Sequence, residues 1–449
     1  MTFPSSPAQL VVSGGSAIRL RRCMDRMTNG SCSVAIFSSF SSMGWMRESY
    51  SCHSWHSPVR TEVSKYERKA DGASCLIIMS EHQYPGLYVH VPFCKTKCPY
   101  CDFYSKPSLS LVPDWIDALR EETLLYRDRF AQFDTVYLGG GTPSLLSAKE
   151  IELLLHHLRS AFSISPCSEF TLEANPDDIT PDKLSSYRTL GINRLSLGVQ
   201  SFCDQELRSL NRRHTALQAV NALETIKNET AFQVGVDLMY GLPGQTELSW
   251  TETLEKAIRF QPEHLSCYQL TFEDRTPFGK MLAEGKISAL CEEDERAFFV
   301  LTSTFLQRHG YVHYEISNFA RGQENASRHN KKYWQHAPYL GLGPSAHSFQ
   351  EGIRWWNVRD LQAYFDCLKQ GIPPLAEKEI LTQEQHRLES LMLGFRTKEG
   401  VRRGLIASEP RFEAVIRALK NSGLVEISDE RVIPTLEGFL VADSIPLLF

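Results

Sequence analysis

The sequence has 449 residues, of which 42% are hydrophobic and 22% charged, with a formal net charge of −5 and an isoelectric point near 6.3. A chain of this length and composition can bury a substantial core and exceeds one average domain. The weakly acidic balance excludes the basic field that sequence-blind nucleic-acid binding requires, so we expect no nucleic-acid partner. No apolar run approaches the roughly 18 residues needed to cross a bilayer, so we expect no transmembrane segment.

Residues 1–79 differ in composition from the rest of the chain. The first sixty residues contain fourteen Ser, six Arg, no Lys and two acidic residues, without a sustained hydrophobic period, and we expect most of this extension to be disordered. Such a start is typical of an organellar presequence, although Trp45, Trp55 and four Cys are unusual in one. The simpler interpretation is an upstream start codon, with Met79 as the natural first residue of a cytoplasmic protein. A true presequence would place the protein in an organelle.

From residue 87 onward a strand-then-helix pattern repeats six times. Strands are expected at Leu87–Val91, Thr135–Gly139, Glu169–Ala174, Arg194–Val199, Gln233–Met239 and Leu265–Leu270. Amphipathic segments such as Pro113–Phe130, Ile151–Phe162 and Leu248–Phe260 predict the helices between them. Parallel strands joined by right-handed helical crossovers curl into a barrel whose carboxyl strand ends form the active face. The sequence therefore predicts an α/β fold, with a partial (β/α)6 TIM-like barrel over residues 80–275.

After about residue 275 this pattern stops. A long helix, Glu292–His309, leads into an aromatic, His-rich segment, which predicts an α+β extension over residues 276–378. From Thr382 two amphipathic helices precede a hairpin that turns at Asp429-Glu430, which predicts a small winged-helix-like domain over residues 379–449. The charges of this domain are mixed, so we expect it to pack against the protein rather than to read nucleic acid.

A compact group of cysteines follows the first predicted strand. Cys94, Cys98 and Cys101 lie within eight residues, whereas the other cysteines are scattered. Three thiolates can bind three irons of a [4Fe–4S] cubane and leave the fourth iron open, while structural zinc normally has four protein ligands. The number of thiols favours an iron–sulfur cluster in a reducing compartment. The alternatives are three buried free cysteines, or a zinc site completed by a distant residue such as His90.

The Cys-x3-Cys-x2-Cys spacing directly after a first strand resembles the radical S-adenosylmethionine (SAM) superfamily. The resemblance implies that the open iron binds the amino and carboxylate groups of SAM, and that one electron cleaves SAM to a 5′-deoxyadenosyl radical. The protein would supply orientation and would exclude water and oxygen. The resemblance further implies that Tyr100 lies near the adenine and that Tyr88 packs beside the cluster.

Glycines and polar residues stand at the ends of the other predicted strands. The segment Gly139-Gly140-Gly141-Thr142-Pro143 follows the second strand, and its glycines would let the backbone approach a ligand and offer it amide and carbonyl groups. By the resemblance, the residues that contact SAM are Gly140, Gly141, Thr142, Glu173, Gln200, Arg212 and Asp237. Each one alone could be an ordinary hydrogen-bonding residue at a strand end, but their coincidence on one rim favours a binding site.

Three longer segments narrow the resemblance to the oxygen-independent coproporphyrinogen oxidase group. They are Leu197-Gly198-Val199-Gln200-Ser201-Phe202, Asp237-Leu238-Met239-Tyr240-Gly241-Leu242-Pro243 and Tyr314-Glu315-Ile316-Ser317-Asn318-Phe319-Ala320. The resemblance covers the chain from Tyr84 to its C-terminus. The dehydrogenase branch of the group, HemN, typically has a fourth cysteine two positions after the third, where this chain has Phe103. The run Cys101-Asp102-Phe103 instead resembles the heme chaperone branch, HemW.

The segment His329-Asn330-Lys331-Lys332-Tyr333-Trp334 resembles the His-Asn-x-x-Tyr-Trp signature of that branch. A neutral imidazole is a common axial ligand of heme iron, and neighbouring aromatic rings offer flat apolar surface to the macrocycle. The resemblance assigns heme binding to His329, Asn330, Tyr333 and Trp334. Without it, a surface histidine whose aromatic neighbours join the core would be the preferred interpretation. His347 is a weaker second candidate, and Trp355-Trp356-Asn357 is expected in the core or at the lip of the site.

We therefore expect a heme chaperone on a radical SAM scaffold, which holds a [4Fe–4S] cluster and exchangeable SAM, binds heme and passes it to an acceptor protein. Catalysis is not required by this hypothesis. The main rival is an oxygen-independent coproporphyrinogen III dehydrogenase, which decarboxylates its substrate to protoporphyrinogen IX by radical hydrogen abstraction; Phe103 argues against it. The third hypothesis is a radical enzyme acting on an unrelated substrate, with His329 in a structural role.

Overall fold

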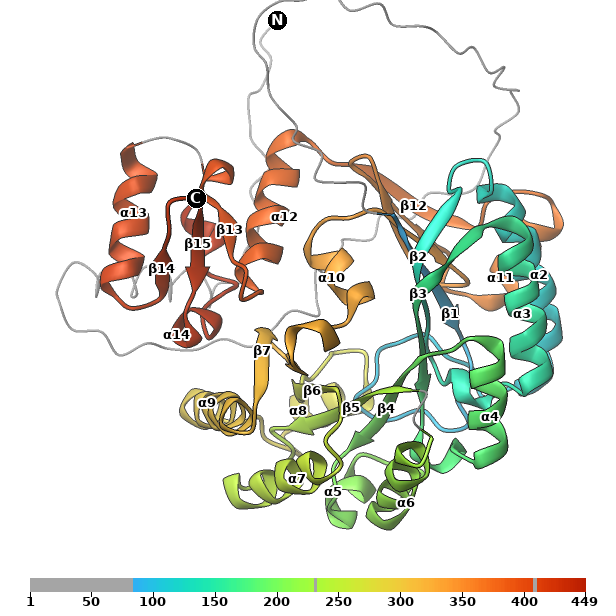
Figure 1. Cartoon of the computed structure of the whole chain (residues 1–449), viewed down its shortest axis with the longest axis horizontal. Helices are drawn as coiled ribbons and strands as arrows, with labels where there is room; N and C mark the ends of the chain where they lie inside the picture. The colour runs from blue at the N-terminus through green and yellow to red at the C-terminus, as the bar shows by residue number, and fades with distance from the viewer. Residues whose placement is uncertain (1–83, 230–231, 407–409) are drawn as a thin grey trace, which may run out of the picture.

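Six parallel strands form the centre of the fold, which we describe from a computed structural model for residues 84–229, 232–406 and 410–449 (Figure 1). The extension predicted at residues 1–79 lies outside these described residues. The strands are β1 (Gly86–Val91), β2 (Gln132–Gly140), β3 (Ser163–Ala174), β4 (Arg194–Gln200), β5 (Gln233–Tyr240) and β6 (His264–Gln269). They lie side by side in chain order, with parallel pairing throughout, which confirms the predicted βα arrangement.

Helices cross over between the strands and cover the outer side of the curved sheet (Figure 1). They are α2 (Val112–Tyr126), α3 (Ala148–Ala161), α4 (Pro181–Leu190), α5 (Asp204–Ser209), α6 (Ala216–Lys227) and α7 (Glu247–Arg259). Three of them begin with a reciprocal capping box, in which the side chain of Ser147, Thr215 or Thr246 accepts the backbone N–H three residues later. These caps satisfy amides that the first helical turn leaves without partners, so each helix starts where the sequence supplies a cap.

Each barrel strand separates an apolar outer face from a polar inner one. On β2, Val136 and Leu138 are fully buried beneath the helices, while Tyr137 lines the interior. On β3, Leu172 is buried in the same way, and Thr171 and Glu173 face the interior. Successive side chains of a strand point to opposite faces, so alternation along the strands builds a hydrophobic core outside and a polar chamber inside.

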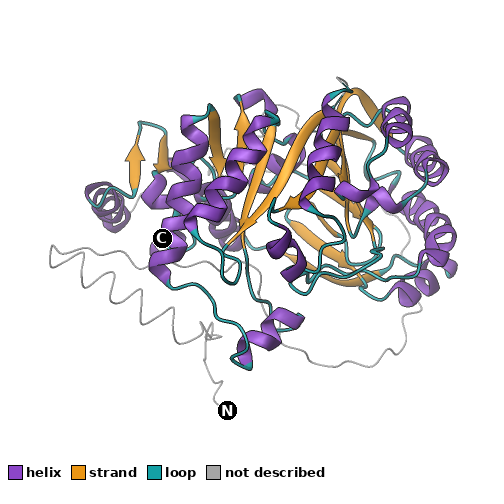
Figure 2. Cartoon of the chain, turned by 90° about the horizontal axis from the view of Figure 1, so that it is seen from below, coloured by secondary structure: helices purple, strands orange, loops and turns teal. Residues whose placement is uncertain are grey.

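The residues that follow the barrel extend its sheet at both edges (Figures 1 and 2). After α8 (Pro277–Ala283) and α9 (Glu292–Arg308), they form β7 (Tyr311–Glu315), β8 (Asn318–Arg321), α10 (Arg328–Trp334), β9 (Tyr339–Leu342), β10 (His347–Gln350), β11 (Ile353–Asn357), α11 (Leu361–Lys369) and β12 (Leu375–Ile380). The strand order of the 12-stranded sheet is β12-β11-β10-β9-β1-β2-β3-β4-β5-β6-β8-β7. β9 pairs in parallel with β1, so α10, which precedes β9, is brought to the barrel.

The C-terminal residues form a small domain with its own apolar core. Its elements are α12 (Gln383–Phe395), β13 (Val401–Arg402), α13 (Pro410–Asn421), β14 (Val425–Ile427), β15 (Arg431–Pro434) and α14 (Leu436–Phe439). The helix–helix–hairpin order agrees with the prediction. Arg396 links this domain to the end of β7, because its guanidinium contacts the buried Glu315 at 3.0 Å and its carbonyl accepts the Ile316 N–H. Within the described ranges, no helix is both long and apolar enough to span a membrane.

Candidate functional site: one cavity through the barrel

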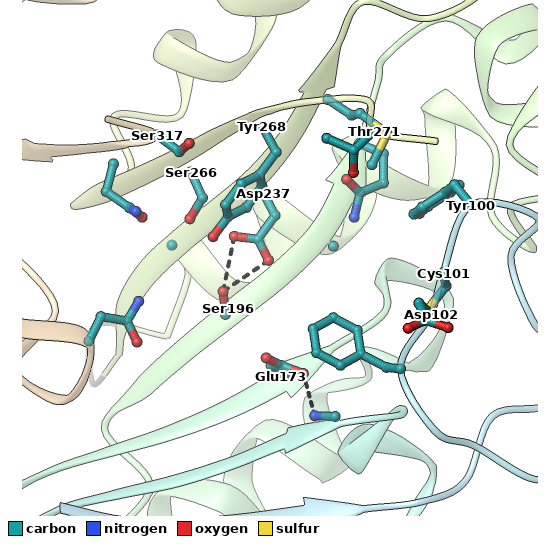
Figure 3. Close-up of a pocket in the computed structure, with 18 of the residues that line it drawn as sticks. Tyr100, Cys101, Asp102, Glu173, Ser196, Asp237, Ser266, Tyr268, Thr271 and Ser317 are labelled. Carbon is teal, nitrogen blue, oxygen red and sulfur yellow. Dashed lines mark hydrogen bonds between the residues drawn. The ribbon is translucent and has the colours of Figure 1, made fainter. Parts of the chain in front are cut away.

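A cavity of about 1190 Å³ runs through the barrel interior, from the thiol loop at the carboxyl ends of the strands to helix α10 near their amino ends. Its lining combines the thiol loop after β1, the glycine loop after β2, the ends of β3 to β6, helix α10 and residues 439–443 of the C-terminal domain. Figure 3 shows part of this lining, with Cys101 and Tyr100 on one side and Asp237, Ser266 and Ser317 on the other. The volume exceeds the roughly 300–1,000 Å³ of ordinary small-molecule sites, so the cavity has room for more than one ligand.

The three clustered cysteines are free thiols that all line this cavity. Their loop is closed at its base because Cys94 N–H donates to the Lys106 carbonyl at 3.1 Å and Lys106 N–H donates to the Pro92 carbonyl at 2.8 Å. Cys101 N–H donates to the Cys98 carbonyl at 3.2 Å, which forms a tight turn. No three His, Cys, Asp or Glu side chains of the described residues converge on one point that a single ion could occupy. A cubane does not require such convergence, because each thiolate binds a separate iron.

An apolar cluster covers one flank of the thiol loop. The ring of Tyr100 packs against that of Phe278 on α8 with a centroid distance of 6.4 Å, and Phe278 N–H donates to the Pro99 carbonyl at 3.0 Å. Met239 and Leu270 belong to the same cluster. Tyr100, which lies inside the cysteine motif, is therefore held in place by α8. The two together form one wall of the cavity.

The glycine loop supports the thiol loop directly. Gly141 N–H donates to the Val91 carbonyl and Thr142 N–H to the Phe93 carbonyl, both at 2.8 Å, while Gly140 N–H donates to Glu173 at 3.0 Å. A Cβ at Gly141 would lie 2.5 Å from the Phe93 oxygen, so only glycine fits. The amides of Gly140, Gly141 and Thr142 are thus hydrogen-bonded within the protein and seat the thiol loop, and the contact of this segment with a ligand through its carbonyl groups stays a prediction. Thr142 also places its hydroxyl 3.4 Å from the Cys94 sulfur.

Arg212 connects the thiol loop to the ends of β3 and β4. Its guanidinium lies 3.5 Å from the Cys98 sulfur and also donates to the Asn175 side chain and, at 2.6 Å, to the Gly198 carbonyl. The Nε atom is buried without a hydrogen-bond partner. A buried N–H without an acceptor is a donor that a ligand oxygen can satisfy.

Glu173 ends β3 beneath the glycine loop. The Tyr137 hydroxyl donates to one of its carboxylate oxygens at 2.8 Å. Gly140 N–H donates to the other at 3.0 Å, which is the hydrogen bond drawn at Glu173 in Figure 3. Burial raises the pKa of Glu173 to about 7, against the effect of these two donors, which favour the charged form. Burial therefore favours the protonated carboxyl group more than in an exposed glutamate.

The ends of β4 and β5 add a second polar group deeper in the barrel. The Ser196 hydroxyl lies within 3.1 Å of both Asp237 carboxylate oxygens, and burial raises the pKa of Asp237 (Figure 3). Gln200 has a φ of 68° at the point where the register between β4 and β5 shifts. Such a conformation is uncommon for a residue with a Cβ, and here it turns the chain at the cavity wall.

Tyr88 and His90 face the cavity from β1. His90 Nε2 donates to the Tyr104 carbonyl at 2.9 Å, so its Nδ1 accepts from the Tyr88 hydroxyl at 3.1 Å. Burial lowers the pKa of His90 to about 4, which keeps the ring neutral. Both ring nitrogens are therefore hydrogen-bonded within the protein.

His329 lies at the other side of the cavity, and only 1% of its surface is exposed. Its Nδ1 is 2.9 Å from the Thr135 hydroxyl and its Nε2 is 2.8 Å from the Tyr333 hydroxyl. The ring of Tyr137 packs beside it with a centroid distance of 5.1 Å. Burial, followed by the nearby Lys332, lowers the pKa of His329 to about 3. The residue is therefore a buried, neutral imidazole rather than a surface histidine.

A buried carboxylate holds the start of α10 against the barrel. The two carboxylate oxygens of Glu169 on β3 accept the backbone N–H groups of Arg328 and His329, each at 2.9 Å. Arg194 on β4 lies 3.7 Å from the same carboxylate, and both side chains are almost fully buried. The first amides of a helix lack intrahelical acceptors, so this carboxylate fixes where α10 begins and places His329 inside the barrel.

The remaining aromatic candidates divide between lining and core. Asn330 and Trp334 line the cavity beside His329, and the ring of Trp334 packs on Tyr314 at 5.8 Å. His347 lines the cavity as well, with its ring stacked on Trp356 at 5.5 Å. Trp355, which was expected in the core or at the lip of the site, is 3% exposed and belongs to the core.

Sequence reasoning missed several polar residues that shape the site. Thr135, Glu169, Ser196 and Ser266 occupy inward positions on β2, β3, β4 and β6. A polar residue at every second position of an otherwise apolar, parallel strand is the signal that could have found them, because both faces of such a strand are usually apolar.

The chain matches two known families. Residues 88–257 match the Radical SAM superfamily, and residues 381–441 match the HemN C-terminal domain. The solved structure of coproporphyrinogen III oxidase (HemN) from Escherichia coli superposes with a TM-score of 0.70 and 24% identity, covering 82% of this chain and 90% of that one. The fold and the families that match thus define a radical SAM barrel with a HemN-type C-terminal domain.

Curated relatives specify the group further. "Heme chaperone HemW" of Bacillus subtilis is 33% identical over 374 residues, which span 80% of this chain and 97% of that protein. The protein of the same name from Synechocystis is 36% identical over 325 residues, 70% of this chain and 78% of that one. "Radical S-adenosyl methionine domain-containing protein 1, mitochondrial" of Danio rerio is 36% identical over 265 residues, 58% of this chain and 60% of that one. The chain belongs to the HemW-like family of radical SAM proteins.

Proposed function

We propose that this protein is a heme chaperone that binds heme through His329 and passes it to an acceptor protein. One observation carries the proposal: the cysteine loop and the His329 helix line the same cavity, although more than two hundred residues separate them in the sequence. The names of the relatives from Bacillus subtilis and Synechocystis support the same assignment.

The cysteine end of the cavity fits a [4Fe–4S] cluster and SAM. Cys94, Cys98 and Cys101 would hold the cluster, and when bound, the cluster and SAM would supply one-electron chemistry. Arg212, with its buried and unpaired Nε, would bind the cofactor's carboxylate, since a guanidinium suits that group. Glu173 would accept hydrogen bonds from hydroxyl groups.

The remaining residues of the predicted SAM set would shape the wall around that cofactor. All of them line the cavity, and they are Tyr88, Tyr100, Gly140, Gly141, Thr142, Gln200 and Asp237. The wall on the side of Tyr100 is apolar and excludes water, whereas Asp237 and Gln200 supply acceptors and donors at the ends of β4 and β5.

The His329 end of the cavity fits heme as cargo. Burial keeps the imidazole neutral, which is the form that binds iron. Tyr333 and Trp334 line the cavity next to it and would contact the macrocycle, with Asn330 beside them. Transfer to an acceptor protein requires heme held by reversible ligation, which a single histidine provides.

The test is a heme titration of the anaerobically purified, cluster-reconstituted protein, followed by absorption spectroscopy. We expect a saturable Soret band at about one heme per chain, which is abolished in His329→Ala, the axial ligand variant. His347→Ala is the matched control, because His347 lines the same cavity and should leave heme binding intact. Binding that is equal in all three proteins would remove His329 from the proposal.

The rival hypothesis is tested with the same preparation. Incubation with reductant, SAM and coproporphyrinogen III should leave the propionate carboxyl groups of the substrate intact. Their stoichiometric loss would overturn the chaperone assignment in favour of the dehydrogenase. If an intact cluster is present but neither heme binding nor decarboxylation occurs, a radical enzyme with another substrate becomes the leading hypothesis.

For localisation we propose the cytoplasm, with an organelle as the alternative. The relative from Danio rerio that carries "mitochondrial" in its name supports the alternative. Sequencing the N-terminus of protein purified from its source distinguishes the two: a chain that begins at Met79 supports translation from that codon and the cytoplasm, whereas a chain that begins at another position supports removal of a presequence.

A further inference from the structure

The imidazole of His329 is enclosed on three sides. Thr135, which is fully buried, contacts Nδ1 at 2.9 Å. A Cβ at Gly86 would lie 3.1 Å from the Cε1 atom, so the backbone of β1 closes that edge of the ring. Tyr137 packs beside the ring, and Glu169 accepts the backbone N–H of His329 at 2.9 Å. The ring therefore has no room to turn while β1, β2 and β3 stay in place.

The fourth side faces the cavity and is occupied by Tyr333. Its hydroxyl lies 2.8 Å from Nε2. Tyr333 lines the cavity, whereas Thr135 does not, so Nε2 is the ring nitrogen on the cavity side. One turn of α10 separates the two residues, which places the tyrosine ring directly beside the imidazole.

We propose that Thr135 and Tyr333 act as a pair that prepares His329 for iron: the Thr135 hydroxyl accepts a hydrogen bond from Nδ1–H, which keeps the proton on that nitrogen, and the Tyr333 hydroxyl donates a hydrogen bond to Nε2 until heme arrives. This inference rests on the proposed heme binding at His329. Thr135 is a positioning residue, because it acts on iron only through the imidazole. Tyr333 is a gate, because its hydroxyl must leave Nε2 before iron can bind there.

The exchange needs no proton acceptor and no redox partner. The hydrogen bond from the Tyr333 hydroxyl to Nε2 breaks, and a dative bond from Nε2 to the heme iron forms. The Nδ1 proton stays on the ring and remains hydrogen-bonded to Thr135. Since the imidazole is enclosed, the tyrosine side chain moves, and the cavity next to it provides the space. A group that accepts a hydrogen bond from Nδ1–H makes the imidazole a stronger electron-pair donor to a metal, as hydrogen-bond partners of metal-binding histidines generally do.

The test compares heme uptake by stopped-flow absorption in the cluster-loaded wild type, Tyr333→Phe, Thr135→Val and Thr135→Ser. Tyr333→Phe removes one hydrogen bond that competes with iron, and we expect uptake to become about twofold to tenfold faster. Thr135→Val keeps the shape and removes the acceptor, so we expect heme affinity to fall about 10- to 100-fold. Thr135→Ser restores the hydroxyl and should bind within about threefold of the wild type.

A vibrational measurement separates positioning from mere packing. In the ferrous heme complex, the iron–imidazole stretching band in the resonance Raman spectrum should move to lower frequency in Thr135→Val and return in Thr135→Ser. Unchanged or slower uptake by Tyr333→Phe overturns the gate, and unchanged affinity and frequency in Thr135→Val overturn the positioning role. If Thr135→Val does not fold, Thr135→Ala, which also removes the hydroxyl, takes its place in the affinity and Raman measurements.

His329→Ala distinguishes failure of this inference from failure of the proposed function. Heme binding that is lost in His329→Ala while the Thr135 and Tyr333 variants behave like the wild type refutes only the pair. Heme binding that persists in His329→Ala refutes both. Iron content and the thermal unfolding midpoint of each variant, measured before heme is added, show whether the cluster and the fold are intact.

Discussion

Replacing Gly141 with alanine should displace the thiol loop and prevent cluster loading. The new Cβ would lie 2.5 Å from the Phe93 oxygen, 2.6 Å from the Val91 oxygen and 2.8 Å from the Phe93 nitrogen. All three are backbone atoms of the segment that leads into Cys94, so none can move aside without moving the loop. Gly141 is distant from the cysteines in the sequence, so the sequence alone does not show that the thiol loop depends on it.

The cost of this substitution follows from two contributions. Overpacking of a rigid site costs about 1–3 kcal/mol. The hydrogen bonds from the Gly141 and Thr142 amides to Val91 and Phe93, both 2.8 Å long, contribute about 0.5–1.5 kcal/mol each. If both are lost, the local destabilisation of the loop is about 2–6 kcal/mol. That range is comparable to the whole stability of many domains, so the loop should leave its seat.

The assay measures iron and sulfide per chain after anaerobic reconstitution, together with the thermal unfolding midpoint. Gly404→Ala is the control, because nothing lies within 4 Å of a Cβ at Gly404 and its φ needs no glycine. We expect normal iron content in the control and strongly reduced iron in Gly141→Ala. Wild-type iron content and an unchanged midpoint in Gly141→Ala would refute the assignment of this glycine to the support of the loop.

Three further predictions concern carboxylates of the site and its supports. Burial raises the pKa of Glu173 to about 7, so its ionised form gains population between pH 6 and 8 and the affinity for SAM, measured by calorimetry, should rise over this interval. In Glu173→Gln the affinity should not change with pH. The same pH dependence in both proteins would contradict a contact between Glu173 and SAM. Glu122→Ala leaves Tyr364, Asn357 and the Gly343 amide without their shared buried acceptor, so the free energy of unfolding should fall by at least about 3 kcal/mol. In the control Glu121→Ala, which removes a solvent-accessible ion pair, it should fall by less than about 1 kcal/mol. Thermal unfolding measures both changes. Arg396→Met leaves the buried Glu315 without its ion-pair partner, so the free energy of unfolding should fall by about 3–5 kcal/mol and proteolytic release of the C-terminal domain should become faster. Adding Glu315→Gln to this variant should restore part of the stability. Strictly additive losses from the two substitutions would show that the pair is not coupled.

Much of the barrel could be predicted because its signals are local. The strands β1 to β6 stand out as short apolar runs separated by amphipathic helices, and their parallel order follows from the crossovers. The position of Cys94, Cys98 and Cys101 after β1 placed them at the active end of the barrel. The extension was harder, because the sequence does not state that β9 pairs with β1 or that β8 pairs with β6. Those pairings depend on edges left open by the barrel.

The amides of the glycine loop show what a glycine pattern in a sequence leaves open. Gly140 and Gly141 were expected at the site because glycine permits close approach, and they do lie there. What approaches closely is the protein's own segment, Val91 to Phe93, and a pattern of residues cannot distinguish a ligand from a neighbouring loop. Only the folded chain reveals which partner takes each amide.

The sequence by itself determined the barrel, the spacing of three thiols and the chemical types placed at the strand ends, because periodicity and motif spacing act over short stretches of chain. The tertiary structure decided which side chains surround His329. Thr135 is 194 residues away from it, and Glu169 is 160 residues away, yet both contact it directly. Their contacts exist because β9 adds to β1 and carries α10 into the barrel. Hydrogen bonds of that kind depend on the sum of all the packing, which no local pattern records.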